Sequence, residues 1–336
     1  MEQLRRRSGF FSRLTMLGGI LTTVLSLLTG RAGAHEAYDT EMVRLIHEIH
    51  EYAKARQPSF GLLANGGAAL FLPYDGNTPE NVKKQLSNLD GQLVESVFFG
   101  YDMKDGAAAP DDASAYFKKA LAVPQRTGMP VFNLDYVHTA RQAEDSYEKN
   151  RRQGYVSWAS FHRLLDTMPE EPPRHVNADD CISLRDVRNF MVLLNPGHFS
   201  SREAYLDALR QSGYDLLILD LFYGDRALTA HEVRTLQQKP QGGRRLVYAY
   251  MSVGEAENYR SYWRPEWDRK KPSWLAERNE AWGSFHVKYW HREWKNILYG
   301  TPDAYLDTIL AAGFDGAFLD VVDGYQYFQQ TEGTES

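Results

Sequence analysis

The sequence predicts a closed barrel of eight parallel strands alternating with helices, the (β/α)8 or TIM-barrel fold. Eight short apolar segments recur along the chain, each followed by a helical stretch. Several are apolar at every position, as at residues 216–219, which is typical of parallel strands covered on both faces. A count of eight favours a closed barrel over an open sheet. The predicted strands span residues 60–64, 93–99, 130–136, 155–158, 190–195, 216–222, 245–253 and 316–321.

The order of these elements is unusual for such a barrel. A helix over residues 41–56 precedes the first strand, and the chain ends just after the last strand, at residues 320–327. We therefore expect the first helix to cover the junction between the last strand and the first. We also expect strand 316–321 to pair in parallel with strand 60–64.

The first 34 residues are organised like a secretory leader. Four arginines precede an apolar run over residues 14–28, and Ala32-Gly33-Ala34 has the pattern of a cleavage site. We expect cleavage near His35 and a secreted or periplasmic protein. An uncleaved anchor helix is the alternative, and it would be the chain's only association with a membrane.

The remaining residues, 35–336, are expected to form one catalytic barrel. The Pro-rich stretch at about 168–183 is the only segment that resembles a linker, and we interpret it as a long connection inside the barrel, because four strands on either side of it cannot close alone. The single cysteine, Cys181, excludes an internal disulfide. An isoelectric point near 6.0 without a basic stripe argues against nucleic-acid binding.

Polar side chains accumulate at the predicted carboxyl ends of the strands, where barrels of this type place their chemistry. Carboxylates that converge there are what glycosidic cleavage uses, because one carboxyl protonates the leaving oxygen while another attacks the sugar carbon or activates water. The residues in question are Asn65, Glu95, Asp135, Asn195, Asp220, Glu255 and Asp320.

Asp320 and Glu95 are the two strongest catalytic candidates. Each lies within a run of apolar residues, where a charge is costly unless it lines a polar cavity. The alternatives are an aspartate that caps the following turn and a glutamate paired to an arginine. We expect the two to face one another across the barrel opening. Asp320 would stay ionised, helped by donors near Asp323 and Tyr325, and Glu95 would be the general acid.

The remaining candidates are expected to bind substrate. Asp135 and Asp220 end apolar strands and either hold sugar hydroxyls or belong to the polar layer of the barrel. Glu255 follows a strand and a glycine, although it equally fits an acid at a helix start. Six of the seven tryptophans lie between residues 263 and 294, and most of them are expected to form the core of an insertion. One or two aromatic residues of this region are expected to contact sugar. The full substrate-binding set is Asn65, Asp135, Asp220, Glu255, Tyr259, Trp290, Asp323 and Tyr325.

Other chemistries find no support in the sequence. It has no H-E-x-x-H pattern, no paired cysteines spaced for zinc and no phosphate-binding loop of the Walker type. We therefore expect neither a metal nor a cofactor. A metal-dependent deacetylase on the same barrel is disfavoured for the same reason.

Three motifs resemble glycoside hydrolase family 114. Residues 250–260 (YMSVGEAENYR) are similar to the family's YxSxGEAEDYR, and residues 313–323 (GFDGAFLDVVD) to its GFDGxxLDxxD. Residues 287–294 resemble the intervening VRYWDxEW. The resemblance implies a TIM barrel with endo-α-1,4-polygalactosaminidase-like activity, and it places the catalytic pair on Asp320 and Glu95.

Residues 41–165 resemble the second half of the same family, so the chain looks circularly permuted. The chain departs from the family's motifs in two places: Asn258 stands where the family usually has Asp, and residues 62–69 replace a more polar segment. The sequence thus predicts a glycosidase that cleaves an α-linked amino-sugar exopolysaccharide with two carboxylates. The alternative is a non-catalytic barrel that binds polysaccharide.

Overall fold

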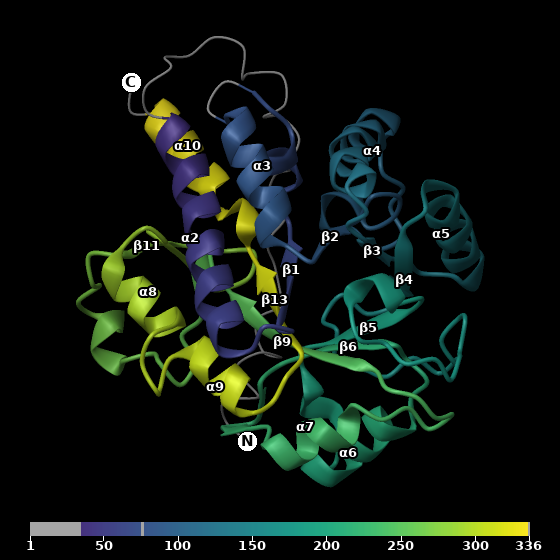
Figure 1. Cartoon of the computed structure of the whole chain (residues 1–336). Coiled ribbons are helices and arrows are strands. Elements are labelled where there is room, and N and C mark those ends of the chain that lie inside the picture. Colours follow the sequence, from purple (N-terminus) through teal and green to yellow (C-terminus); the bar gives the residue numbers. More distant parts are fainter. Residues whose placement is uncertain (1–34, 75–76, 335–336) are drawn as a thin grey trace.

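The computed structural model describes residues 35–74 and 77–334, which form an α/β barrel (Figure 1). The predicted leader lies outside the described residues. Eight parallel strands form one sheet in the order β4-β3-β2-β1-β13-β9-β6-β5, and this confirms the predicted fold class. The strands are β1 (Gly61–Asn65), β2 (Gly91–Glu95), β3 (Val131–Tyr136), β4 (Val156–Ser160), β5 (Phe190–Leu193), β6 (Leu216–Leu219), β9 (Leu246–Ser252) and β13 (Gly316–Asp320).

Helices surround this sheet and connect most of its strands. They are α2 (His35–Arg56), α3 (Pro79–Asn88), α4 (Asp111–Arg126), α5 (Ala140–Gln153), α6 (Arg202–Gln211), α7 (Ala230–Leu236), α8 (Arg292–Leu298), α9 (Tyr305–Ala311) and α10 (Tyr325–Thr334). Thr229 shows how the sequence starts one of them: its side chain accepts from the Glu232 amide while the Glu232 carboxylate accepts from the Thr229 amide, a capping box. No helix within the described residues is long and apolar enough to cross a bilayer.

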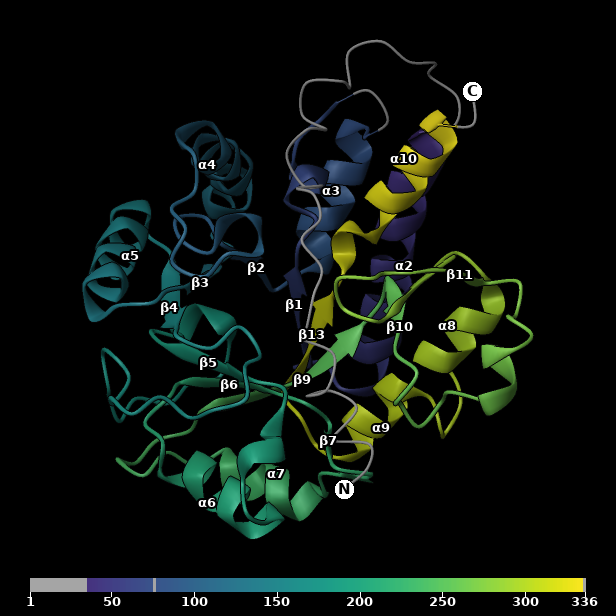
Figure 2. The same cartoon turned by 180° about the vertical axis from the view of Figure 1, so that it is seen from behind.

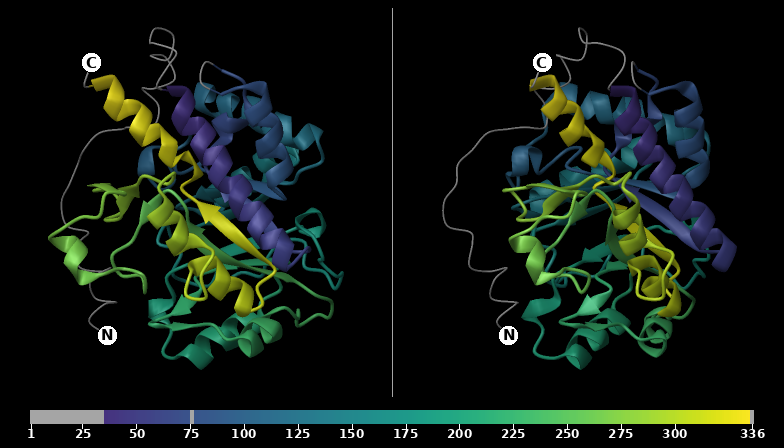
Figure 3. Two further views of the ribbon diagram at one scale, coloured as in Figure 1. Left: turned by 60° about the vertical axis from the view of Figure 1, so that its left-hand side comes forward. Right: turned by 90° about the vertical axis from the view of Figure 1, so that its left-hand side faces the viewer.

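The first and last strands of the chain are neighbours in the barrel. β1 pairs in parallel with β13 in the register Gly61 to Gly316, which confirms the predicted pairing. The chain does not end just after this strand, however, because α10 follows it. α10 packs against α2, as the two helices lying side by side in Figure 3 show. The first helix is thus packed against a last helix that the sequence analysis did not expect.

The connection from β4 to β5 contains no α-helix, so the expectation of a helix after every strand is wrong here. Residues 161–189 run as loop with one short 3-10 turn, η3 (Leu184–Asp186). Among the described residues no strand ladder joins β4 to β5. The gap is closed by the Phe190 ring, which packs edge-on against Phe132 and Trp158 at centroid distances of 5.5 and 6.4 Å.

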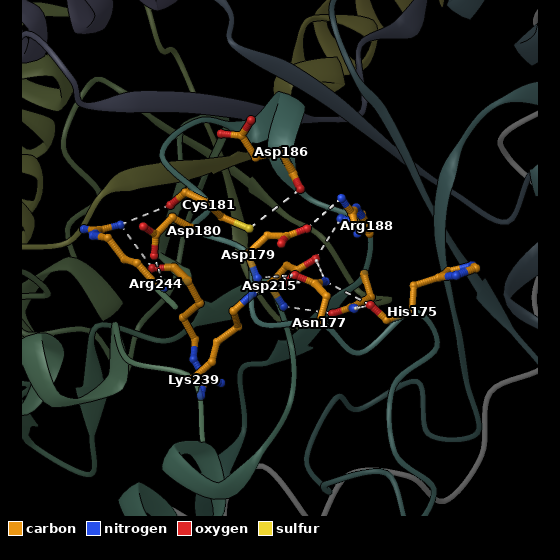
Figure 4. A network of polar contacts seen from close by, with 12 residues as sticks. His175, Asn177, Asp179, Asp180, Cys181, Asp186, Arg188, Asp215, Lys239 and Arg244 are labelled. Atoms are coloured by element: carbon orange, nitrogen blue, oxygen red, sulfur yellow. Dashed lines mark hydrogen bonds and ion pairs between the residues drawn. The ribbon is translucent and has the colours of Figure 1, made fainter. Parts of the chain in front are cut away.

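A polar network at the amino ends of the strands fixes this long connection (Figure 4). The Lys239 ammonium, fully buried, donates to Asp215 at 2.9 Å and to Asn177 at 3.0 Å. Asp215 also accepts from the Arg188 amide at 2.9 Å. Each charge is thus hydrogen-bonded, which offsets the cost of removing it from water. Cys181 lies buried beside this network.

The barrel interior is filled by side chains from alternate positions of the strands. Tyr248 occupies the amino-end layer, and its ring lies where any β-carbon on Gly61 or Gly316 would have to go. Two strands therefore carry glycine at matched register positions so that this ring fits. Above it, Tyr250 and Phe318 pack with ring centroids 6.3 Å apart.

A large insertion follows β9. It contains a three-stranded antiparallel sheet of β10 (Glu255–Ala256), β12 (Phe285–Val287) and β11 (Leu275–Arg278), together with α8. These elements lie beyond the arrowhead of β9 in Figure 2. Trp274 and Trp294 are fully buried within the insertion, in line with the expected aromatic core. A second small ribbon, β7 (Phe222–Tyr223) with β8 (Arg226–Ala227), follows β6.

Candidate active site

Three consecutive strands of the barrel bring two carboxylates and one amide together. Glu95 ends β2, Asn65 ends β1 and Asp320 ends β13, and these strands are neighbours in the sheet. The Asn65 amide nitrogen donates to Glu95 Oε1 at 2.7 Å and to Asp320 Oδ1 at 2.8 Å. The sequence analysis expected the two carboxylates to face one another across the barrel opening, and this expectation is wrong. Their strands, β2 and β13, flank β1, and the Asn65 side chain on β1 bonds to both carboxylates.

Both carboxylates are followed by a residue in the left-handed backbone region. Ser96 has φ +60° and Val321 has φ +61°. This conformation is rare for a non-glycine residue and is a true outlier for a β-branched one such as valine. Backbone of this kind costs on the order of 1–3 kcal/mol and persists where the surroundings dictate it, most often at functional sites. The same unusual turn after both strands marks this position as the site.

Three glycines from two segments make the turn after Asp320 possible. A β-carbon on Gly254 would collide with the Val321 carbonyl oxygen, and one on Gly67 would lie 2.6 Å from Val322 Cγ1. Gly66 (φ +76°) faces the Asp323 carboxyl in the same way, at 3.0 Å. The Asn65-Gly66-Gly67 segment and the Gly254 segment therefore hold the chain around Asp320 from both sides.

The charge state of Asp320 differs from the expectation. Burial, followed by the neighbouring charge of Glu95, raises the pKa of Asp320 to about 7. Hydrogen bonds from Asn65, the Val321 amide and Tyr250 oppose this shift without cancelling it. This upward direction runs against the expectation that Asp320 stays ionised with donors supplied near Asp323 and Tyr325.

Two tyrosines that the sequence did not single out belong to the site. The Tyr136 hydroxyl donates to Glu95 Oε2 at 2.6 Å. Burial raises the pKa of Tyr136 well above its usual value, so this hydroxyl stays protonated. Tyr250 hydrogen-bonds to Asp320 from β9. The signal for Tyr136 was its place at a strand end, two residues beyond an inward-facing Leu134.

Asp135 points away from the site, which corrects its assignment as a substrate ligand. Successive strand residues face opposite sides, so Asp135 turns outward when Tyr136 turns inward. Its carboxyl is fully buried against α5, where it accepts from Ser146 Oγ at 2.6 Å, and it also accepts from the Phe98 amide at 3.1 Å. It anchors the loop after β2 to helix α5.

Asp220 is engaged in a buried ion pair. Both of its oxygens accept from Arg260 Nη1, at 2.9 and 2.8 Å, and Oδ1 also accepts from the Phe222 amide at 2.8 Å. Arg260 is in turn bonded to Glu257 and to the Tyr305 hydroxyl. This network connects β6 to the insertion, and a sugar hydroxyl would have to displace part of it to reach Asp220.

Asp323 and Glu255 lie close to the catalytic pair. Asp323 is an exposed residue, and the charges of Glu255 and Glu95 act on its carboxyl. Glu255 is buried and accepts from Asn279 Nδ2 at 2.8 Å and from Ser284 Oγ at 2.5 Å. Asp323 is therefore open to a ligand, whereas Glu255 anchors a turn of the insertion.

The three aromatic residues predicted to bind substrate have different surroundings. Tyr325 is fully buried beneath Tyr74, so it cannot contact substrate and that assignment is corrected. Trp290 packs between the rings of Tyr38 and Phe328, at 5.2 and 4.9 Å, near α2 and α10. Tyr259 is exposed, and its hydroxyl donates to Glu257.

The described residues contain no group of three His, Cys, Asp or Glu side chains that could hold a metal ion. The site is instead built from carboxyl, amide and phenol groups. These groups can donate and accept protons and can place a carboxylate beside an electrophilic carbon.

Comparison with known proteins bears on this site directly. Residues 203–336 match the model of Glycoside-hydrolase family GH114. The match confirms the resemblance inferred from the motifs around Glu255 and Asp320. The GH114 segment runs from α6 to the C-terminus, so it contains Asp320, while Glu95 and Asn65 lie outside it. The similarity of these residues to a glycoside hydrolase family favours glycosidase chemistry at the site, and circular permutation stays a prediction.

Individual relatives are similar over part of their lengths. An uncharacterized protein of Deinococcus radiodurans is 36% identical over 172 residues, 51% of this chain and 50% of the relative. The uncharacterized protein MJ1477 of Methanocaldococcus jannaschii is 35% identical over 133 residues, 39% of this chain and 37% of the relative. An uncharacterized protein of Thermotoga maritima is 43% identical over 83 residues, 24% of each chain. The chain thus spans half or less of the length of these relatives.

Proposed function

We propose that this chain is a glycoside hydrolase that cleaves an α-linked amino-sugar exopolysaccharide of the polygalactosamine type. The observation that carries the proposal is the Glu95–Asn65–Asp320 arrangement, in which one amide nitrogen holds two carboxyl groups at adjacent strand ends. The match of residues 203–336 to GH114 supports the reaction class.

The surroundings of the two carboxyl groups favour different catalytic roles for Asp320 and Glu95. Asp320, whose pKa is raised to about 7, carries the proton that a general acid gives to the glycosidic oxygen. Glu95 accepts hydrogen bonds at both oxygens, from Asn65 and Tyr136, as suits an ionised, acceptor-only carboxylate. This is the reverse of the division expected from the sequence, in which Glu95 was the general acid.

The reaction then follows in two steps. Glu95 attacks the anomeric carbon while Asp320 protonates the departing oxygen, so the carbon–oxygen bond breaks and a glycosyl ester forms on Glu95. Asp320, now ionised, takes a proton from a water molecule that attacks the same carbon and releases Glu95. Both carboxyl groups return to their starting states, and one water molecule is consumed for each bond cleaved.

The spacing of the carboxyls favours this double displacement. Glu95 Oε1 and Asp320 Oδ1 both contact the same nitrogen, at 2.7 and 2.8 Å, so they cannot lie farther apart than the sum of these distances. That limit applies to the two nearer oxygens, and it is compatible with the roughly 5–5.5 Å carboxyl separation typical of retaining enzymes. We therefore propose retention of the α configuration.

The surplus of acid groups around the site supports a cationic substrate. The chain has a formal net charge of −6, and Asp323 adds an exposed carboxyl beside the catalytic pair. A sugar with a free ammonium group would be attracted by this field and could pair with Asp323. Export through the predicted leader would place such an enzyme where an exopolysaccharide is found.

The test is hydrolysis of de-N-acetylated α-1,4-linked galactosamine polymer, measured as new reducing ends. Wild type is compared with Asp320→Asn, Glu95→Gln and Glu170→Gln, the last an exposed acid in the β4–β5 connection. We expect each site variant to lose about 10²–10⁴-fold in turnover and Glu170→Gln to match wild type. Binding of the polymer without hydrolysis by wild type would instead favour a non-catalytic polysaccharide-binding barrel.

A further inference from the structure

The six tryptophans of the insertion differ in one respect. Five of them make ring contacts with other aromatic side chains, for example Trp263 with Phe285 at 5.1 Å and Trp274 with Trp294 at 5.2 Å. Trp282 makes no such contact and no hydrogen bond with any described residue. It is 55% exposed. The insertion therefore has a complete aromatic core without Trp282, and packing does not explain why an indole stands there.

Trp282 lies in a tight turn between β11 and β12. The Gly283 amide donates to the Asn279 carbonyl at 2.7 Å, and the Asn279 amide donates to the Ser284 carbonyl at 2.8 Å. The Asn279 side chain also accepts from the Ala281 amide at 3.1 Å. Gly283 has φ +75°, which a glycine adopts without strain. The turn is thus held by its own backbone and presents the indole from a fixed position.

The same turn is attached to the wall of the candidate active site. Asn279 and Ser284, at its two ends, each bond one oxygen of the buried Glu255 carboxylate, at 2.8 and 2.5 Å. Glu255 follows Gly254, whose backbone packs against Val321, the residue after Asp320. The charge of Glu255 also acts on Asp323. The turn is thus joined through Glu255 to the segment that packs against the residue after Asp320.

We propose that Trp282 is a stacking platform for a sugar ring of the polymer, at a subsite outside the one where the bond is cut. The inference rests on the proposed function and adds a residue that binds the chain away from the reacting carbon. An indole offers a large apolar face to the C–H groups of a pyranose, and its negative π face also attracts an ammonium group. An amino sugar has both features, and a rigid ring on a rigid turn loses little entropy on binding.

The experiment measures polymer binding in an inactive background, so that the ligand stays intact. Glu95→Gln is combined with Trp282→Ala, with Trp282→Phe and, as a matched control, with Ile182→Ala. Ile182 is another exposed apolar residue, 76% exposed, in the β4–β5 connection beside the amino-end network. Affinity for soluble α-1,4-galactosamine polymer is measured by calorimetry, and thermal melting checks that every variant is folded.

We expect Trp282→Ala to weaken binding about tenfold, the equivalent of about 1.4 kcal/mol, while Trp282→Phe stays within about threefold and Ile182→Ala is unchanged. Equal affinity in the Trp282→Ala and parent proteins, or no measurable binding by the parent, would overturn the proposal. Reducing-end release by the Trp282-containing wild type is measured separately. If wild type hydrolyses the polymer but Trp282→Ala does not change affinity, only the role of Trp282 as a stacking platform is refuted. If Trp282→Ala weakens binding but wild type does not hydrolyse the polymer, only the catalytic proposal is refuted.

Discussion

Replacing Asp320 by asparagine should stabilise the protein at alkaline pH. Asparagine preserves the acceptor oxygen that Asn65 and the Val321 amide contact, at 2.8 and 2.9 Å, but it has no proton to lose. Wild type must bury a charge at Asp320 once the pH exceeds the pKa of about 7. The variant avoids this cost, so a change that abolishes catalysis is expected to make the fold more resistant to unfolding.

The magnitude follows from proton linkage. The pKa of Asp320 rises from 3.8 to about 7, so the folded state binds this proton more tightly than the unfolded chain does. Its stabilising contribution is complete below pH 3.8 and is lost as the pH rises to about 7. At 1.36 kcal/mol per pH unit the full loss is about 4 kcal/mol, of which about 3 kcal/mol falls between pH 4.5 and pH 8.

The assay is urea unfolding of wild type and Asp320→Asn at pH 4.5, 6, 7 and 8, with Glu170→Gln as the control. The difference in unfolding free energy between Asp320→Asn and wild type should grow with pH by up to about 3 kcal/mol, while the control difference stays flat. A difference that does not change with pH would show that Asp320 is ionised throughout. In that case it could not be the general acid.

Three further substitutions probe the supporting structure. Tyr136→Phe removes the donor to Glu95, so we expect turnover to fall about tenfold and the melting temperature to change little, as reducing-end assays and calorimetry would show; unchanged turnover would contradict this role. Gly67→Ala places a methyl group 2.6 Å from Val322 in left-handed backbone, and urea unfolding should show a loss of at least about 1 kcal/mol. Lys239→Met leaves the buried Asp215 carboxylate without its ion-pair partner at the amino end of the barrel. The free energy of unfolding should fall by about 3–5 kcal/mol while KM is unchanged, and a variant as stable as wild type would refute this role of the ion pair.

The fold was predictable because it depends on local patterns. Apolar runs of strand length, such as residues 216–219, identified all eight strands, and the shifted order predicted the β1–β13 pairing. The missing helix between β4 and β5 was not foreseen. Its place is taken by an extended connection fixed by distant partners such as Lys239, which no local pattern reveals.

The candidate site was predictable only in part. Asp320 and Glu95 were identified because a carboxylate within an apolar run is costly to bury unless it lines a polar cavity. Tyr136 was missed and Asp135 misassigned because polarity alone does not tell which of two successive strand residues faces inward. The raised pKa of Asp320 was not foreseen because its causes are tertiary: burial and a second carboxylate held nearby by Asn65.

Chemical rescue by azide tests the central claim most directly, that Glu95 is the nucleophile and Asp320 the general acid. Glu95→Ala and Asp320→Ala are each incubated with sodium azide and an aryl α-glycoside of a galactosamine disaccharide, and the anomeric configuration of the azido sugar is read by NMR. Glu95→Ala should yield the β-azide, because azide then attacks directly from the face that Glu95 vacates. Asp320→Ala should yield the α-azide, because azide attacks the ester formed on Glu95. The opposite pair of products, or no rescue of either variant, would contradict the account.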